Sequence, residues 1–125
     1  MKTGSSFRPN RNFRFPGEER LKGREEILKV LGERKGISCS GAKLLRIRNG
    51  LEFNRIAFTF PRKYGNAVER NYSRRLSREV YRLLRSDLKP GFDMVLMVFP
   101  GGDTFAKRMD QMRELFCRSG LLKPS

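Results

Sequence analysis

The stretch that decides the fold is residues 62–85, RKYGNAVERNYSRRLSREVYRLLR. It predicts the longest helix of the chain, from about Asn66 to Arg85, and at about 100° per residue its side chains separate into two faces. The first face spans roughly 140° of arc and forms an arginine stripe made of Arg70, Asn71, Arg74, Arg75, Arg78, Arg82 and Arg85. The opposite face holds Val68, Tyr72, Leu76, Val80, Leu83 and Leu84. We therefore expect this helix to pack on a sheet and to turn its arginine stripe outward.

The arginine stripe indicates a partner rich in phosphate. A guanidinium group can hold a phosphate through two hydrogen bonds and can stack on a base. Arginines four residues apart, such as Arg70, Arg74 and Arg78, repel one another, and a polyphosphate ligand would relieve that repulsion. The alternative is an ordinary solvated helix face, although such faces usually mix both signs of charge. Asn71 either bonds a sugar or base edge or points at water.

The junction before this helix adds to the same signal. Arg62 and Lys63 place two more positive charges at the helix N-terminus, where free backbone N–H groups favour phosphate. Asn66 opens the helix beside them. Gly65 either allows a close approach or a positive φ, or is an ordinary turn glycine.

The segments upstream predict a helix and a β-hairpin. A helix is expected over residues 23–31, and residues 37–48 suit a strand that either stays whole or splits in two. Asn49-Gly50 is a strong turn signal, and residues 53–60 are rich in aromatic and β-branched side chains. We expect the strands on either side of this turn to pair.

The segments downstream complete an α+β domain. Residues 93–99, DMVLMVF, form a continuous apolar run between Pro-Gly turns, which predicts a central strand covered on both faces. A last helix is expected from near Asp103 to about Cys117. Its predicted buried stripe is Phe105, Met109, Met112 and Phe116. The expected order is helix, two or three strands, helix, strand, helix.

Composition excludes several kinds of chemistry. Lys and Arg total 28 against 13 Asp and Glu, a formal net charge of +15, which favours a polyanionic partner. Histidine is absent, so no histidine base, Ser-His or Cys-His nucleophile or histidine zinc ligand is available. We expect no catalytic residue and no metal site in the protein. Cys39 and Cys117 are expected to be reduced and to have no disulfide partner.

The N-terminal residues 1–19 predict a flexible basic arm, and residues 20–123 a single RNA-binding domain. The arm either orders on RNA or is a disordered leader with no role. No signal peptide or membrane-spanning run is recognisable, so we expect a cytoplasmic protein with no membrane partner.

Residues 62–79 also carry an ordered pattern. It reads Arg62-Lys63-x-Gly65-Asn66-Ala67-Val68-x-Arg70-Asn71-x-x-Arg74-Arg75-x-x-Arg78-Glu79. This pattern resembles the signature of the ribonuclease P protein family, and the resemblance extends over about residues 20–123. The family's Arg-Asn-Arg trio departs here at its third position, where Tyr72 stands and is expected to face the core.

The resemblance implies a fold and a function. The fold is a sandwich like the second domain of ribosomal protein S5, of order αβββαβα with a left-handed βαβ crossover. The function is that of the protein subunit of ribonuclease P, a ribonucleoprotein endonuclease that removes the 5′ leader of precursor tRNA and leaves a 5′-phosphate. The RNA subunit would be the catalyst and would bind magnesium. The protein would hold no cofactor itself, but would bind the ribonuclease P RNA and precursor tRNA and improve substrate affinity at physiological magnesium.

The resemblance also implies two sets of site residues. The set expected to bind RNA is Arg62, Lys63, Asn66, Arg70, Asn71, Arg74, Arg75, Arg78 and Arg82. The set expected to line a leader cleft between the first helix and the sheet is Arg20, Lys22, Ile27, Leu31, Phe58 and Phe60. Ile27 and Leu31 stand where the family commonly has aromatic residues. Phe58 and Phe60 either replace those aromatics or belong to the core.

Three other functions are compatible with a basic helix. A ribosomal or assembly protein could share the fold and bind RNA without any catalytic complex. A DNA-binding protein could lay the helix in a major groove, although the stripe offers few base-reading groups beyond Asn71. An autonomous nuclease is disfavoured because histidine is absent and the carboxylates are scattered.

Overall fold

The computed structural model describes residues 19–33, 36–61, 63–101 and 103–123. In chain order the elements are α1 (Arg24–Leu31), β1 (Ile37–Cys39), β2 (Ala42–Arg48), β3 (Arg55–Thr59), α2 (Ala67–Leu84), the 3-10 helix η3 (Arg85–Asp87), β4 (Phe92–Val98) and α3 (Phe105–Arg118). The three predicted helices are confirmed, with small shifts of their ends. The predicted α+β class and the order αβββαβα are confirmed as well. Apart from Glu19, the predicted arm lies outside the described residues.

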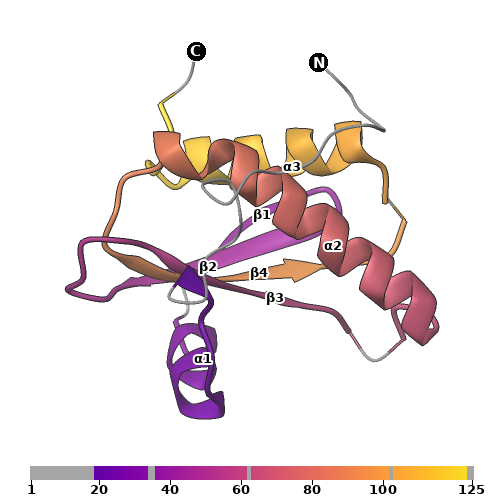
Figure 1. Cartoon of the computed structure of the whole chain (residues 1–125), viewed down its shortest axis with the longest axis horizontal. Helices are drawn as coiled ribbons and strands as arrows, with labels where there is room; N and C mark the ends of the chain where they lie inside the picture. Colours follow the sequence, from indigo (N-terminus) through magenta and orange to yellow (C-terminus); the bar gives the residue numbers. More distant parts are fainter. Residues whose placement is uncertain (1–18, 34–35, 62, 102, 124–125) are drawn as a thin grey trace.

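The four strands form one sheet in the order β1-β2-β4-β3. β3 and β4 are parallel, and α2 makes the crossover between them, whereas the other neighbouring strands are antiparallel. α2 and α3 lie on one face of the sheet and α1 lies on the other, as Figure 1 shows. β4 is therefore a central strand covered on both faces, which its apolar run predicts.

The predicted hairpin across Asn49-Gly50 is wrong. β2 and β3 are not neighbours, because β4 lies between them and pairs with both. The hairpin of this sheet joins β1 to β2 instead, with Cys39 opposite Ala42. A local turn signal predicts that the chain reverses direction, but it does not determine which strand pairs with which. The apolar β4 segment buries both of its faces only inside the sheet, and that requirement separates β2 from β3.

Alternation along β4 divides the core into two clusters. Met94, Leu96 and Val98 pack beneath α2 and α3 with most of the buried apolar residues of the domain. Val95 faces the other way and packs with Leu21, Val30 and Leu45 under α1. Because side chains of a strand alternate between faces, the parity of each strand residue decides which helix it contacts.

Candidate nucleic-acid interface

The inner face of α2 differs from the predicted one. Val68, Tyr72 and Leu83, which were expected to be buried, are 76%, 47% and 45% exposed. Ser73 and Ser77 are fully buried in their place. The core-facing side of α2 is therefore rotated toward the arginine stripe, and the stripe lies on the flank of the helix, not on its outermost side.

The buried serines are explained by an arginine on α3. Arg108 is 0% exposed and donates hydrogen bonds to the hydroxyls of Ser73 and Ser77 and to the carboxylate of Asp103. Its buried charge is thus neutralised by an ion pair and hydrogen-bonded by two hydroxyls, as a buried ion requires. Phe105, expected in the buried stripe of α3, is instead 43% exposed. The seam between α2 and α3 is polar where the sequence pattern predicts apolar packing.

Asp103 extends this polar seam to the junction before α2. It accepts hydrogen bonds from the Tyr64 hydroxyl at 2.6 Å and from the Ser73 hydroxyl at 2.9 Å. Burial alone would raise the pKa of Asp103, but the hydrogen bonds from Tyr64, Ser73 and Arg108 outweigh it and lower that pKa. Burial, and then the hydrogen bond to Asp103, raise the pKa of Tyr64. The network therefore fixes the N-terminal half of α2 against α3.

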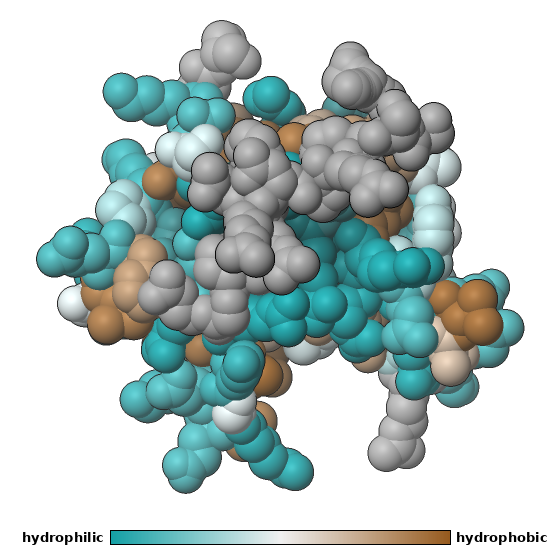
Figure 2. Space-filling model, in the orientation of Figure 1, coloured by the Kyte–Doolittle hydropathy of each residue, from teal (hydrophilic) through white to brown (hydrophobic). Residues whose placement is uncertain are grey.

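The arginine stripe lies beside β3 and the chain that precedes α1. The guanidinium of Arg74 stands over the Phe60 ring, 5.0 Å from its centroid. Burial lowers the pKa of Arg78, and the neighbouring charges of Arg20 and Arg74 lower it further. Figure 2 shows hydrophilic side chains across much of the face on which α2 lies. Positive charges are thus crowded together along this flank of the helix.

The members of the stripe differ in what they already contact. Arg75 and Asn71 are exposed, and in the described part of the chain no carboxylate lies within ion-pair distance of Arg74, Arg75 or Arg78. Arg82 pairs with Glu79, and its side chain is only 6% exposed. A contact between Arg82 and RNA would therefore require this pair to open.

The junction before α2 is built around a capping box. The Asn66 side chain accepts from the backbone N–H of Glu69, and the Glu69 carboxylate accepts from the backbone N–H of Asn66, both at 2.9 Å. Gly65 has a φ of 147°, and a Cβ there would stand 2.3 Å from Glu69 Oε1. The Asn66 side chain and two backbone donors are therefore already used, which reduces the phosphate site expected at this helix end. Lys63 is exposed, and Arg62 lies outside the described residues.

The six predicted cleft residues do not come together. Ile27 packs with the cluster under α1, Leu31 is 36% exposed, and Arg20 and Lys22 are exposed before α1. Phe58 and Phe60 lie on the opposite face of the sheet, where they contact Tyr81 and Tyr64. They cannot replace aromatic residues beside α1, because the sheet lies between them and that helix.

Another set of residues borders α1 on its own face of the sheet. Lys43, Met97 and Thr59 form one row across β2, β4 and β3, and all three are partly exposed. In Figure 1, α1 lies under one end of this face and leaves the other end uncovered. Sequence reasoning missed this row, although alternation in β4 and the strand register together would have identified it.

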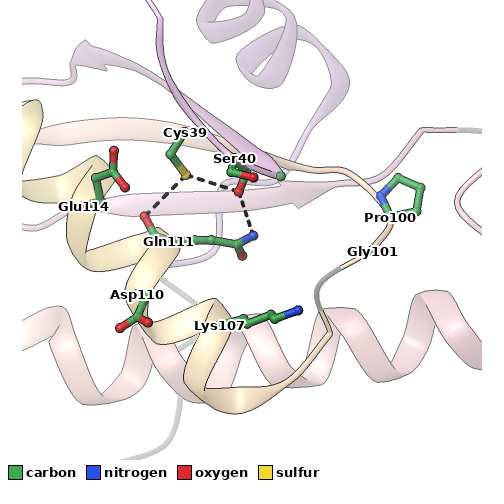
Figure 3. A pocket seen from close by; sticks show the side chains of 9 residues that line it. Cys39, Ser40, Pro100, Gly101, Lys107, Asp110, Gln111 and Glu114 are labelled. Carbon is green, nitrogen blue, oxygen red and sulfur yellow. Dashed lines mark hydrogen bonds between the residues drawn. The ribbon is translucent and has the colours of Figure 1, made fainter.

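The pocket in Figure 3, of about 400 Å³, is not suited to RNA. It lies between the β1–β2 turn and α3, where Gln111 Nε2 donates to the Ser40 carbonyl at 3.0 Å. Asp110 and Glu114 line it against a single Lys107, so its balance of charge is negative. Burial, and then Glu114, raise the pKa of Cys39, which keeps this thiol protonated.

Among the described residues, no group of three or more His, Cys, Asp or Glu side chains could hold a metal ion. Both cysteines are free. None of the helices within the described ranges is long and apolar enough to cross a membrane.

Comparisons with known proteins agree with this arrangement. A family model described as Ribonuclease P matches residues 15–119. The ribonuclease P protein component of Dictyoglomus turgidum is 41% identical over 113 residues, which are 87% of this chain and 95% of that protein. The RNase P protein structure from Thermotoga maritima superposes with a TM-score of 0.72 at 26% identity, covering 80% of this chain and 96% of that one. The RNase P protein structure from Staphylococcus aureus, at 16% identity, covers 84% of this chain and 98% of that one with a TM-score of 0.75, which shows a shared fold. The chain belongs to the ribonuclease P protein family.

Proposed function

We propose that this protein acts in tRNA processing as the protein subunit of ribonuclease P, and that the arginine stripe of α2 binds the RNA subunit. The observation that carries the proposal is the crowding of like charges around Arg78. Burial, and then the neighbouring charges of Arg20 and Arg74, lower the pKa of Arg78. No carboxylate among the described residues pairs with it. A phosphodiester backbone at this flank would relieve the repulsion and release its own counterions.

In this proposal the RNA subunit supplies the chemistry and the magnesium ions. The protein contributes a rigid, positively charged surface, because the polar seam of Tyr64, Ser73, Asp103 and Arg108 fixes α2 against α3. Asp103 is held ionised by these donors and is committed to that seam. The protein thus lowers the electrostatic cost of bringing two polyanions together, and this effect is largest at low magnesium.

We place the 5′ leader of precursor tRNA on the uncovered end of the α1 face. Lys43 supplies a cation there, and Met97 and Thr59 supply a partly exposed surface beside it. A single strand requires a positive groove and a platform for its bases. Met97 and the apolar side of α1 at Ile27 offer apolar contact where aromatic stacking is absent, so binding of the leader should depend little on its base sequence.

The test is cleavage of precursor tRNA at low magnesium by a bacterial ribonuclease P RNA, with and without this protein. Cleavage at the mature 5′ end is expected with both components and not with the protein alone. The double variant Arg74→Gln with Arg78→Gln should weaken RNA binding and reduce the slope of log affinity against log salt by about 1.8. The matched control is Lys107→Gln with Arg113→Gln, which removes the same charge from exposed positions on α3.

The outcomes separate the proposal from a general effect of charge. The control variant should keep the wild-type slope and cleavage rate. If the α2 and α3 variants lose the same affinity and the same slope, the stripe is not the binding surface. If the wild-type protein adds nothing to the RNA at low magnesium, the chain is not a working subunit of this enzyme.

A further inference from the structure

A second basic surface lies at the end of β2, away from the arginine stripe. It is a groove of about 740 Å³ that contains Arg46, Arg48, Lys89 and Phe92. β2 contributes the two arginines, β4 contributes Phe92, and the segment after η3 contributes Lys89. The last turn of α3 and the residues after it, Ser119 to Leu121, form the opposite wall. The stripe flanks β3, and β4 separates β3 from β2, so the two surfaces lie over different strands.

The groove orders its cations around an aromatic ring. The guanidinium carbons of Arg46 and Arg48 lie 5.5 and 5.4 Å from the centroid of Phe92. Arg46 also donates to the Ser119 carbonyl at 2.8 Å, and the backbone N–H of Lys89 donates to the Leu121 carbonyl at 2.9 Å. These contacts hold two guanidinium groups in place before any ligand arrives, which lowers the entropy cost of binding.

The groove also contains one carboxylate, Glu33, so its cations Arg46, Arg48 and Lys89 exceed its anions by two. In the parts of the chain that the structure describes, no carboxylate lies within ion-pair distance of Arg46, Arg48 or Lys89. By contrast, Arg85 and Arg108 each pair with one carboxylate and Arg55 pairs with two. In addition, the Nε atom of Arg46 is buried and has no hydrogen-bond partner. A buried donor without an acceptor is costly, so the hydrogen bonds of the Arg46 guanidinium are only partly satisfied within the described residues.

We propose that this groove binds a single-stranded RNA segment, in addition to the RNA bound by the arginine stripe. The exposed guanidinium of Arg48, already lying over Phe92, offers its outer side to a base. A phosphate of the same strand is bound by Lys89 and Arg46. An acidic protein segment could use the positive charge, but it would gain nothing from the guanidinium plane supported by the ring. Two RNA surfaces on one small domain let it join two segments of an RNA assembly.

The inference extends the proposed function, since it concerns RNA beyond the contact made by α2. The segment comes either from the ribonuclease P RNA or from precursor tRNA, and the shared chemistry is an unpaired nucleotide strand. The test variant is Arg48→Gln with Lys89→Gln, both at exposed positions outside the two core clusters. The control is Lys107→Gln with Arg113→Gln, and the comparison variant is Arg74→Gln with Arg78→Gln.

Two measurements are made on the full-length protein with ribonuclease P RNA, with and without precursor tRNA. In the first, affinity is measured at 50 and 200 mM salt. Removing the phosphate contact of Lys89 from a single strand should make the ratio of wild-type to variant affinity fall about 2.5-fold between these salts. In the second, hydroxyl-radical footprinting locates the protected nucleotides. The groove variant should lose one protected segment and keep the segment that depends on Arg74 and Arg78. The molecule that carries the lost segment identifies the source of the strand.

The inference is overturned if the groove variant matches the α3 control in affinity, salt dependence and footprint. That result would favour an acidic protein segment as the ligand of the groove. If the comparison variant alone loses binding, the proposed function stands and this inference fails. If the groove variant alone loses binding, the groove is an RNA site and the role of the stripe fails.

Discussion

Replacing Asp103 by Asn removes the carboxylate at the centre of the polar seam between α2 and α3. Asn keeps the size of the side chain but loses the charge that pairs with Arg108. Arg108 is 0% exposed and cannot turn to solvent, so the variant leaves a buried cation without its partner. The hydroxyls of Tyr64 and Ser73, which donate to Asp103, lose a charged acceptor as well.

The size of the effect follows from this burial. Breaking a buried ion pair on one side costs roughly 3–5 kcal/mol. The Asp103 side chain is 24% exposed, which lets water reach the vacated position and favours the lower end of the range. We expect a loss of about 3 kcal/mol in the free energy of unfolding. For a domain of this size that corresponds to a decrease of roughly 10–15 °C in the melting temperature.

The assay is urea and thermal unfolding of both proteins between pH 7 and pH 2.5. The folded-state pKa of Asp103 is lowered, so its stabilising effect is fully present above its unfolded-state pKa and is lost as pH falls through the folded-state pKa. The stability difference between wild type and variant should therefore be constant from pH 7 to about pH 5 and should shrink below about pH 4.

A matched control separates the buried pair from carboxylates in general. Glu114→Gln removes the carboxylate that pairs with Arg118 on α3, the helix that also carries Arg108. Both side chains of this pair are 52% exposed. Its expected cost is below about 0.5 kcal/mol. The reasoning is refuted if Asp103→Asn costs no more than this control, or if its cost stays the same at pH 2.5.

Three further predictions concern α2 and its junction. Gly65→Ala should lower the free energy of unfolding by about 1–2 kcal/mol, because its Cβ displaces Glu69 from the capping box; unchanged urea unfolding would contradict this. Val68→Ser should change the free energy of unfolding by less than about 0.5 kcal/mol, since Val68 is 76% exposed. A larger loss of stability in thermal melting would show that this side chain is buried. Tyr72→Ala should weaken RNA binding by about fivefold or more at constant stability, because an exposed ring can stack on a base. Equal affinity in a titration with ribonuclease P RNA would exclude that contact.

The helices and the central strand were predictable because their signals are local. The apolar run of β4 and the start of α2 at Asn66 can be recognised from neighbouring residues in the sequence. The neighbours of each strand were not predictable in this way. Asn49-Gly50 favours a hairpin between β2 and β3, but the gain from burying both faces of β4 outweighs it. The paired residues of β4 lie 38 positions from those of β3 and 44 to 56 positions from those of β2, so a local turn signal carries no information about this competition.

The interior of α2 was missed because helical periodicity was read from apolar residues alone. Ser73 and Ser77 carry no hydrophobic signal, and their burial depends on Arg108, which lies on another helix. Val68, Tyr72 and Leu83 are apolar but exposed, and counting them as buried placed the predicted core-facing side of α2 too far from the arginine stripe. The predicted position of the arginine stripe was wrong for the same reason, because the stripe lies on the flank of α2 and not on its outermost side. The pair between Arg82 and Glu79 was not predicted either.

Of the two alternatives for Phe58 and Phe60, the structure supports the core, and the reason for Phe58 is strand parity. Phe58 was chosen for its aromatic ring, but the β3 residues that face the α1 side are Arg55, Ala57 and Thr59, and Phe58 alternates with them. A shift of one residue moves a strand side chain to the opposite face. The parity becomes known only once α1 is placed on the sheet.

The central place of β4 also constrains how the chain folds during synthesis. β2 and β3 do not pair with each other. Until residues 92–98 have left the ribosome, β2 pairs only with the three-residue strand β1, and β3 pairs with no other strand of the sheet. α2, the helix with the arginine stripe, is complete before that strand and has no finished sheet on which to pack. Folding should therefore be a single late event with a slow, non-local step. A chain that stops before Phe92 should form no stable sheet.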